Sequence, residues 1–270
     1  MGGLEGMVAE ITFLGTGDAF SAGRRGNVAL LIEDADFRML AEVGPMIMQQ
    51  LARANVQPVD IEQLFVSHSH GDHVLGFPMF AISRSFESSP RLHVYSGSNT
   101  IATLKMLWSL VFTGYGSHHL KCEWHNLSER NSDRMELSHG VTLRTVVVSS
   151  PPGMPTLAAR WDFPDGASLT FATDTLPCAS VVELARGSDL LIHEASFSAE
   201  LQPDIEPATY FHSTARQAGE VARQADCPRL ALVHLGSVAG ERPDVLVGET
   251  RAGTDLQVIV PEDGERISVP

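Results

Sequence analysis

The sequence predicts a mixed α/β fold in which two β-sheets are sandwiched between layers of helices. Strand-like apolar runs are followed by helical patterns, and this order occurs twice along the chain. Hydrophobic residues make up 43% of the 270 residues and charged residues 19%, a composition that supports a sizeable core and excludes a disordered chain. No linker rich in Pro, Gly or Ser divides the sequence, so we expect a single domain over residues 1–270.

Strands are expected where short apolar runs end in turn residues, and helices where apolar residues recur at helical spacing. The expected strands are residues 8–14, 28–32, 37–41, 63–67, 92–95, 141–148, 156–163, 168–172, 190–193, 230–234 and 257–260. The expected helices are residues 45–54, 74–84, 99–111, 180–185 and 214–225. Loops at the ends of such strands are where α/β proteins place reactive groups.

The charge balance favours a small substrate. The formal net charge is −14, and the longest basic run is Arg24-Arg25. An acidic surface repels polyphosphate, which counts against extended nucleic-acid binding. No apolar stretch is long enough to span a membrane. We therefore expect a small-molecule substrate and no membrane partner.

The cysteines and the start of the sequence suggest a reducing, cytoplasmic location. Cys122, Cys178 and Cys227 are widely spaced and form no CxxC pair, so they indicate neither a disulfide framework nor a thiolate metal site. The first residues lack the basic and apolar regions of a secretory signal. We expect a cytoplasmic protein.

Three histidines and an aspartate directly follow the predicted strand at residues 63–67. They form the segment His68-Ser-His70-Gly-Asp72-His73. Imidazole nitrogens and carboxylate oxygens are ligands that suit zinc, manganese or iron. Residues two apart on an extended strand point the same way, so His68 and His70 can share one metal ion. Asp72 and His73 can then face a second ion, as in two-metal hydrolases.

The alternative is a chance run of histidines in a loop. With 11 histidines in 270 residues, three of them beside a carboxylate in so short a segment are improbable by chance. Such polar groups at the end of an apolar strand would also be costly to desolvate without a partner. We therefore predict a site for one or two zinc ions, with manganese or iron as alternatives.

The histidine–aspartate segment resembles the HxHxDH hallmark of the metallo-β-lactamase superfamily. Further motifs occur in the order seen in its ribonuclease Z-like branch, over about residues 8 to 260. These motifs are Phe13-Leu-Gly-Thr-Gly17, Ser83-Arg-Ser-Phe86, Phe171-Ala-Thr-Asp174-Thr, Leu191-Ile-His193-Glu194-Ala-Ser-Phe197, His212-Ser-Thr-Ala215 and Leu232-Val-His234. The resemblance implies a four-layer αβ/βα metallo-β-lactamase sandwich and a metal-dependent hydrolase.

The resemblance also implies a set of metal ligands. They are His68 and His70 for one ion, Asp72, His73 and His234 for the other, and Asp174 as the bridge between the two. Asp174 and His234 each follow a predicted strand. A lone aspartate or histidine after a strand usually has a structural, hydrogen-bonding role. Because the histidine–aspartate segment is also present, we expect Asp174 and His234 to be metal ligands instead.

Catalytic roles are expected for Asp72, His212 and Glu194. Asp72, beside the metal ions, can orient or deprotonate the attacking water. The resemblance implies that His212 protonates the leaving group while Glu194 holds its imidazole, and a neighbouring carboxylate raises the pKa of a histidine. The alternative is that Ser213 caps the helix beginning at Thr214 and His212 is merely its neighbour.

One position departs from the family pattern. Members supply a third histidine to the first ion, and alignment on Arg160 places Pro152 at that position. A proline side chain has no donor atom, so the first ion should bind more weakly or take a substitute ligand. The candidates are His118, His119 and His139, although each is better explained as an ordinary loop residue.

The sequence supports three hypotheses about the function and its substrate. The leading one is a metal-activated water acting on a small phosphodiester, ester or lactone. The second is a ribonuclease Z-type tRNA 3′-processing endonuclease, against which stand the acidic charge and the lack of room before Asp174 for the basic arm that clamps tRNA. The third is a non-catalytic metal-binding or ligand-sensing module. A homodimer is expected only from the frequency of dimers among enzymes.

Overall fold

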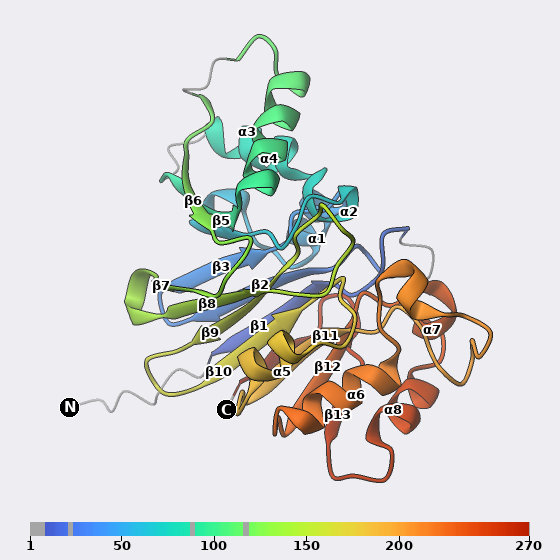
Figure 1. Cartoon of the computed structure of the whole chain (residues 1–270). Helices are drawn as coiled ribbons and strands as arrows, with labels where there is room; N and C mark the ends of the chain where they lie inside the picture. Colours follow the sequence, from blue (N-terminus) through green and yellow to red (C-terminus); the bar gives the residue numbers. More distant parts are fainter. Residues whose placement is uncertain (1–8, 21–23, 87–89, 116–118, 270) are drawn as a thin grey trace.

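The computed structural model describes residues 9–20, 24–86, 90–115 and 119–269. Two seven-stranded sheets pack face to face, and helices cover the outer face of each sheet (Figure 1). This arrangement confirms the α/β sandwich predicted from the sequence.

The first sheet contains the N-terminal strands and the last strand of the chain. Its strands are β1 (Glu10–Gly15), β2 (Ala29–Asp34), β3 (Phe37–Ala41), β4 (Gln63–Phe65), β5 (Leu92–Gly97), β6 (Cys122–Leu127) and β14 (Arg266–Ser268). Their order across the sheet is β14-β1-β2-β3-β4-β5-β6. Strands β3 to β6 are parallel, so their carboxyl ends meet at one edge.

The second sheet is built from the rest of the chain. Its strands are β7 (Asp133–Glu136), β8 (Thr142–Val147), β9 (Leu157–Asp162), β10 (Ser168–Ala172), β11 (Leu190–Glu194), β12 (Arg229–Val233) and β13 (Gln257–Ile259). Their order is β13-β12-β11-β10-β9-β8-β7. Strands β10 to β13 are parallel, whereas β7 to β10 form an antiparallel meander, of which β8, β9 and β10 are strands expected from the sequence.

Two groups of helices form the outer layers (Figure 1). The helices beside the first sheet are α1 (Ile47–Arg53), α2 (Gly71–Val74), α3 (Phe77–Ser85) and α4 (Ser98–Val111). Those beside the second are α5 (Ala179–Ala185), α6 (Ala215–Gln224), α7 (Ser237–Gly240) and α8 (Pro243–Arg251). Short 3-10 turns occur at Pro58–Asp60, Ser138–Gly140 and Pro207–Tyr210. In the part of the chain described, no helix is long and apolar enough to cross a bilayer.

Some elements differ from the sequence prediction. The helix expected at residues 74–84 is two helices, α2 and α3, because Gly76 and Pro78 begin a new helix after Val74. Strands β6, β7 and β14 were not predicted. Strands β6 and β7 are partly exposed, and polar residues interrupt both of them, so they lack the apolar run that marks a buried strand.

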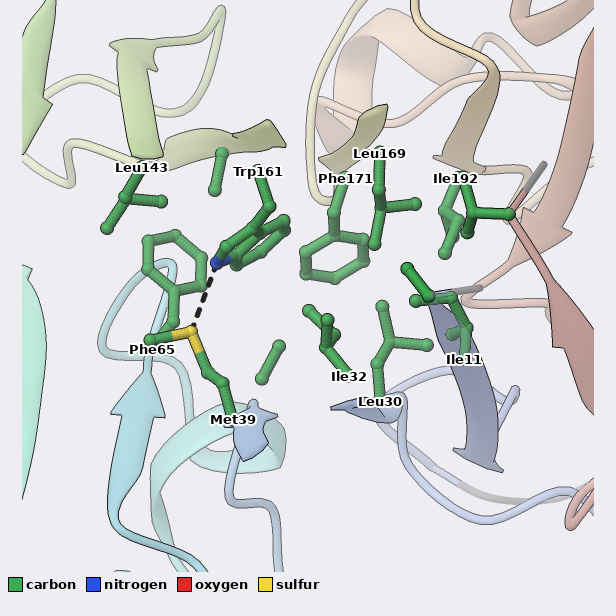
Figure 2. Close-up of a cluster of buried hydrophobic side chains, with 14 of the residues drawn as sticks. Ile11, Leu30, Ile32, Met39, Phe65, Leu143, Trp161, Leu169, Phe171 and Ile192 are labelled. Atoms are coloured by element: carbon green, nitrogen blue, oxygen red, sulfur yellow. Dashed lines mark hydrogen bonds between the residues drawn. The ribbon is translucent and has the colours of Figure 1, made fainter. Parts of the chain in front are cut away.

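The core between the sheets is centred on Trp161. Its side chain is fully buried, and Figure 2 shows it pointing from β9 toward Met39 and Phe65 of the first sheet. The Trp161 and Phe65 rings meet edge to face with centroids 5.7 Å apart. The indole Nε1–H donates to Met39 Sδ at 3.1 Å. This contact joins the two sheets directly.

Replacing Trp161 by alanine is expected to lower the free energy of unfolding by about 3–5 kcal/mol, because it opens a large cavity between the sheets. Urea denaturation followed by circular dichroism measures the change. Met106→Ala is the control, since that apolar side chain is 63% exposed. Equal midpoints for the two variants would contradict the role given to Trp161.

Candidate active site

The predicted site residues lie at the carboxyl ends of parallel strands from both sheets. His68 follows β4. In the second sheet Asp174 follows β10, Glu194 ends β11 and His234 follows β12. Because the sheets are stacked, groups far apart in sequence converge at one edge of the sandwich, the usual place for a site in α/β folds.

His68, His70 and Asp174 form the first cluster. His68 Nε2 lies 2.9 Å from His70 Nδ1. Asp174 Oδ2 lies 3.4 Å from His68 Nε2 and 3.7 Å from His70 Nδ1. The three donor atoms therefore surround one point, as ligands of a single ion would.

The second cluster contains Asp72, His73, His234 and again Asp174. Asp72 Oδ2 lies 3.1 Å from His73 Nε2 and 3.3 Å from His234 Nε2. Asp174 Oδ1 lies 3.3 Å and 3.4 Å from the same two nitrogens. Asp174 thus directs one oxygen to each cluster, so the two clusters share its carboxylate.

The buried nitrogens of His73 fit a metal ion. Its side chain is fully buried, and neither ring nitrogen makes a hydrogen bond among the described residues. Nevertheless Nε2 lies within about 3.3 Å of two carboxylate oxygens. A buried imidazole without hydrogen bonds is costly, whereas nitrogen and oxygen donors around one point are what zinc requires. The residues present therefore suit a divalent metal ion.

The electrostatics of the second cluster favour a cation. Burial alone would lower the pKa of His234, but the charges of Asp174 and Asp72 outweigh it and raise that pKa to about 9. Burial would likewise lower the pKa of His73, and Asp174, Glu42 and Asp72 raise it well above its ordinary value. Against the effect of burial, the histidines hold the pKa of Asp72 and Asp174 below the usual range. The carboxylates stay ionised and need positive charge beside them.

Supporting residues that no sequence motif marks lie beside the outer nitrogens of His68, His73 and His234. Glu42 Oε2 lies 3.1 Å from His73 Nδ1. Ser67 Oγ lies 2.9 Å from His68 Nδ1, and Ser196 Oγ lies 3.0 Å from His234 Nδ1. The two serine hydroxyls set the tautomers of His68 and His234 and leave the inner nitrogen of each ring free for a metal ion, whereas the Glu42 carboxylate places a negative charge beside His73. The available signal was position, since Glu42 directly follows a buried strand as His234 does.

The backbone is left-handed at three of these positions. The φ angles are 70° at Glu42, 47° at Asp174 and 54° at His234. Residues other than glycine pay a conformational cost there, and such outliers gather at functional sites. At each position the chain leaves its strand and turns the side chain into the cluster. Backbone strain is therefore part of how the site is assembled.

His212 and Glu194 form the pair expected from the sequence. The His212 Nδ1–H donates to Glu194 Oε1 at 2.9 Å. Glu194 is fully buried and also accepts hydrogen bonds from the Thr175 N–H and from the Ser196 N–H and O–H. Burial lowers the pKa of His212, but the Glu194 charge raises it above its ordinary value.

The suggestion that Ser213 caps the following helix is wrong. The cap of α6 is Thr214, whose side chain accepts from the Gln217 N–H in a capping box. Ser213 Oγ instead donates to the Thr175 carbonyl at 2.7 Å. The buried His193 donates from Nδ1 to the Glu194 carbonyl and lies outside both clusters.

The first cluster has no further donor among the described residues. Pro152 is exposed in the turn between β8 and β9. His139 is an exposed turn residue, and His119 packs against Tyr115. Neither histidine belongs to the cluster, while His118 lies outside the described residues. No substitute for the missing histidine is found in the part of the chain described.

A cavity of about 410 Å³ opens beside the second cluster and is lined partly by His212 and His234. Phe20, Phe197 and Tyr210 supply aromatic surface. Among the described residues that line it, no lysine or arginine is present. Its size suits a small molecule.

Residues 9–210, most of the chain, match the family described as Anti-Pycsar protein Apyc1. A ribonuclease Z from Methanosarcina acetivorans is 26% identical over 306 residues, covering 96% of this chain and 98% of that protein.

Two solved structures show the same fold. The metallo-β-lactamase fold protein YhfI from Bacillus subtilis has a TM-score of 0.80 at 19% identity, covering 97% of this chain and 99% of that one. A diphosphatase from the PhnP family has a TM-score of 0.72 at 20% identity, covering 97% of each chain.

Proposed function

The chain belongs to the family described as Anti-Pycsar protein Apyc1, and from that membership and the geometry of its site we propose that it hydrolyses a small phosphodiester. It is a metal-dependent hydrolase of the ribonuclease Z-like branch of the metallo-β-lactamase superfamily. The observation that carries the proposal of a small substrate is the cavity of about 410 Å³ beside His212 and His234.

We assign the metal ligands as two overlapping sets. These are His68, His70 and Asp174 for one zinc ion and Asp72, His73, His234 and Asp174 for the other. When bound, zinc lowers the pKa of water and polarises the oxygen under attack. Asp72 orients the attacking water, and His212, held by Glu194, gives a proton to the leaving oxygen.

A phosphodiester is favoured over a lactone or a carboxylic ester. The ribonuclease Z and the diphosphatase act, by their names, on RNA and on a diphosphate. Both substrates contain P–O bonds. An alkoxide expelled from phosphorus needs a proton that His212 is placed to supply, but so does one expelled from a carboxylic ester, so the preference for phosphorus rests on these two relatives.

A ribonuclease acting on tRNA is the second candidate, favoured by the similarity to ribonuclease Z over 96% of this chain. Three observations weigh against it. The net charge is −14, the described cavity lining has no lysine or arginine, and β8 and β9 are joined through residues 148–156 alone. A polyanion needs matching cations along its backbone.

The test is turnover of bis(p-nitrophenyl) phosphate by zinc-loaded protein, with His73→Ala and the control His139→Asn. We expect turnover in the wild type and the control, and none in His73→Ala. Turnover of p-nitrophenyl butyrate alone would point to a carboxylic esterase. Tight, salt-dependent tRNA binding with cleavage would favour the ribonuclease. Bound zinc without turnover on any of these substrates would favour a sensor.

A further inference from the structure

We propose a second metal-binding site, separate from the active site, formed by His93, Glu123 and His125 on strands β5 and β6. Each residue offers one donor atom, and the three atoms lie within 4.8 Å of one another. The ligand expected there is a divalent transition metal ion such as Zn²⁺. This inference does not depend on the proposed function.

Strand register brings the three side chains together. His93 pairs directly with Glu123 across the parallel β5–β6 ladder. His125 is two residues beyond Glu123, and alternate residues of a strand share a face. His93 also pairs with Gln63, the first residue of β4, whereas the active-site motif begins at His68 beyond the end of that strand. The cluster therefore lies toward the opposite strand ends from the active site.

The spacing of the donor atoms fits a small ion. His93 Nδ1 lies 3.1 Å from His125 Nε2. Two ligands about 2.0–2.1 Å from a tetrahedral zinc ion would stand roughly 3.3 Å apart. Glu123 oxygens lie 3.9 Å from each imidazole. The Glu123 side chain is 53% exposed, so a change of rotamer can bring its carboxylate closer.

Neighbouring rings hold the imidazoles in place before any ion binds. The His125 ring stacks on Tyr95 at 4.4 Å and on His93 at 5.3 Å. Tyr95 is buried in the core, which anchors the stack. Burial and then the nearby His93 lower the pKa of His125, so its nitrogen is neutral and available at neutral pH. Binding an ion would exchange the His93–His125 hydrogen bond for two coordinate bonds.

An ion bound at this site would stabilise the pairing of β6 with β5 at the edge of the first sheet. Strand β6 is the terminal strand on that side, and α4 is the crossover that joins β5 to β6. Binding to the folded state alone raises stability in proportion to the logarithm of the ion concentration. The expected role is stabilisation of this edge strand and of the crossover above it.

The experiment compares the zinc content of the wild type, His125→Gln and Glu123→Gln after equilibration with Zn²⁺ and dialysis. We expect the His125→Gln protein to hold one zinc equivalent per chain fewer than the wild type, and its Zn²⁺-induced rise in melting temperature to be smaller. Glu123→Gln should show the same loss, and because this residue is exposed it keeps the test valid if His125→Gln folds poorly.

The matched control is His139→Asn, which removes an exposed imidazole elsewhere and should keep the wild-type zinc content. Equal zinc content in the wild type and both cluster variants would overturn the proposal. So would an equal loss in His139→Asn, because it would show non-specific binding to surface histidines.

Discussion

The Asp174→Asn protein is expected to lose zinc and at least about 100-fold in kcat/KM on bis(p-nitrophenyl) phosphate. Loss of a group that only supports a ligand already costs roughly 10–100-fold in metal affinity or activity. Asp174 contributes an oxygen to each of the two clusters, so its replacement weakens both at once. The change removes one negative charge while leaving the shape of the side chain almost unaltered.

The fold should tolerate this substitution. Asp174 has a φ of 47°, and asparagine is among the residues that adopt this left-handed region most readily. Zinc content by atomic emission and steady-state kinetics measure the effect. The matched control is Asp226→Asn, because Asp226 also has a left-handed φ of 55° and is exposed far from the clusters. Unchanged zinc content and turnover in Asp174→Asn would refute the bridging role.

The side chains that the structure gathers into the two clusters could be selected from the sequence because they lie in a motif or just beyond the ends of strands. Asp174 and His234 were placed from the resemblance and from their position after apolar strands, and the structure brings both to His73. Glu42 has the same position after β3 and contacts the same histidine. Glu42 was not predicted, because no sequence pattern shows which residue after a strand turns its side chain toward the histidines. That turn depends on a left-handed φ, which the tertiary structure sets.

The His93–Glu123–His125 cluster shows a second limit of prediction. Its residues are distant in sequence and depend on the register of β5 with β6. Strand β6 was not predicted, since its polar residues give no apolar run. Strand β10 was predicted to the residue, because all five of its residues are buried and its sequence SLTFA combines apolar residues with small polar ones.

The His212→Asn protein is expected to retain its zinc and to lose about 10²–10⁴-fold in kcat, the range for a general acid. His212 lies at the cavity, with Nδ1 donating to the buried Glu194. Nε2 is therefore the ring nitrogen that can donate a proton to the leaving group of the substrate. Asparagine can keep the hydrogen bond to Glu194 but has no proton to transfer at neutral pH.

The leaving group distinguishes proton donation from a merely structural role. A series of aryl phosphodiesters with progressively less acidic phenols is the measurement. If His212 is the acid, the defect in His212→Asn grows as the leaving phenolate becomes more basic, because that oxygen depends more on a proton. A loss that is the same for every leaving group would show that His212 only shapes the site.

The pH profile gives an independent measurement of the same role. Although burial lowers the pKa of His212, Glu194 raises it above the ordinary 6.5. A general acid works in its protonated form, so wild-type kcat should fall as pH rises through this raised pKa. The fall should be absent in His212→Asn, which has no group there to titrate. If both proteins lose activity over the same alkaline range, the proton donor is another group.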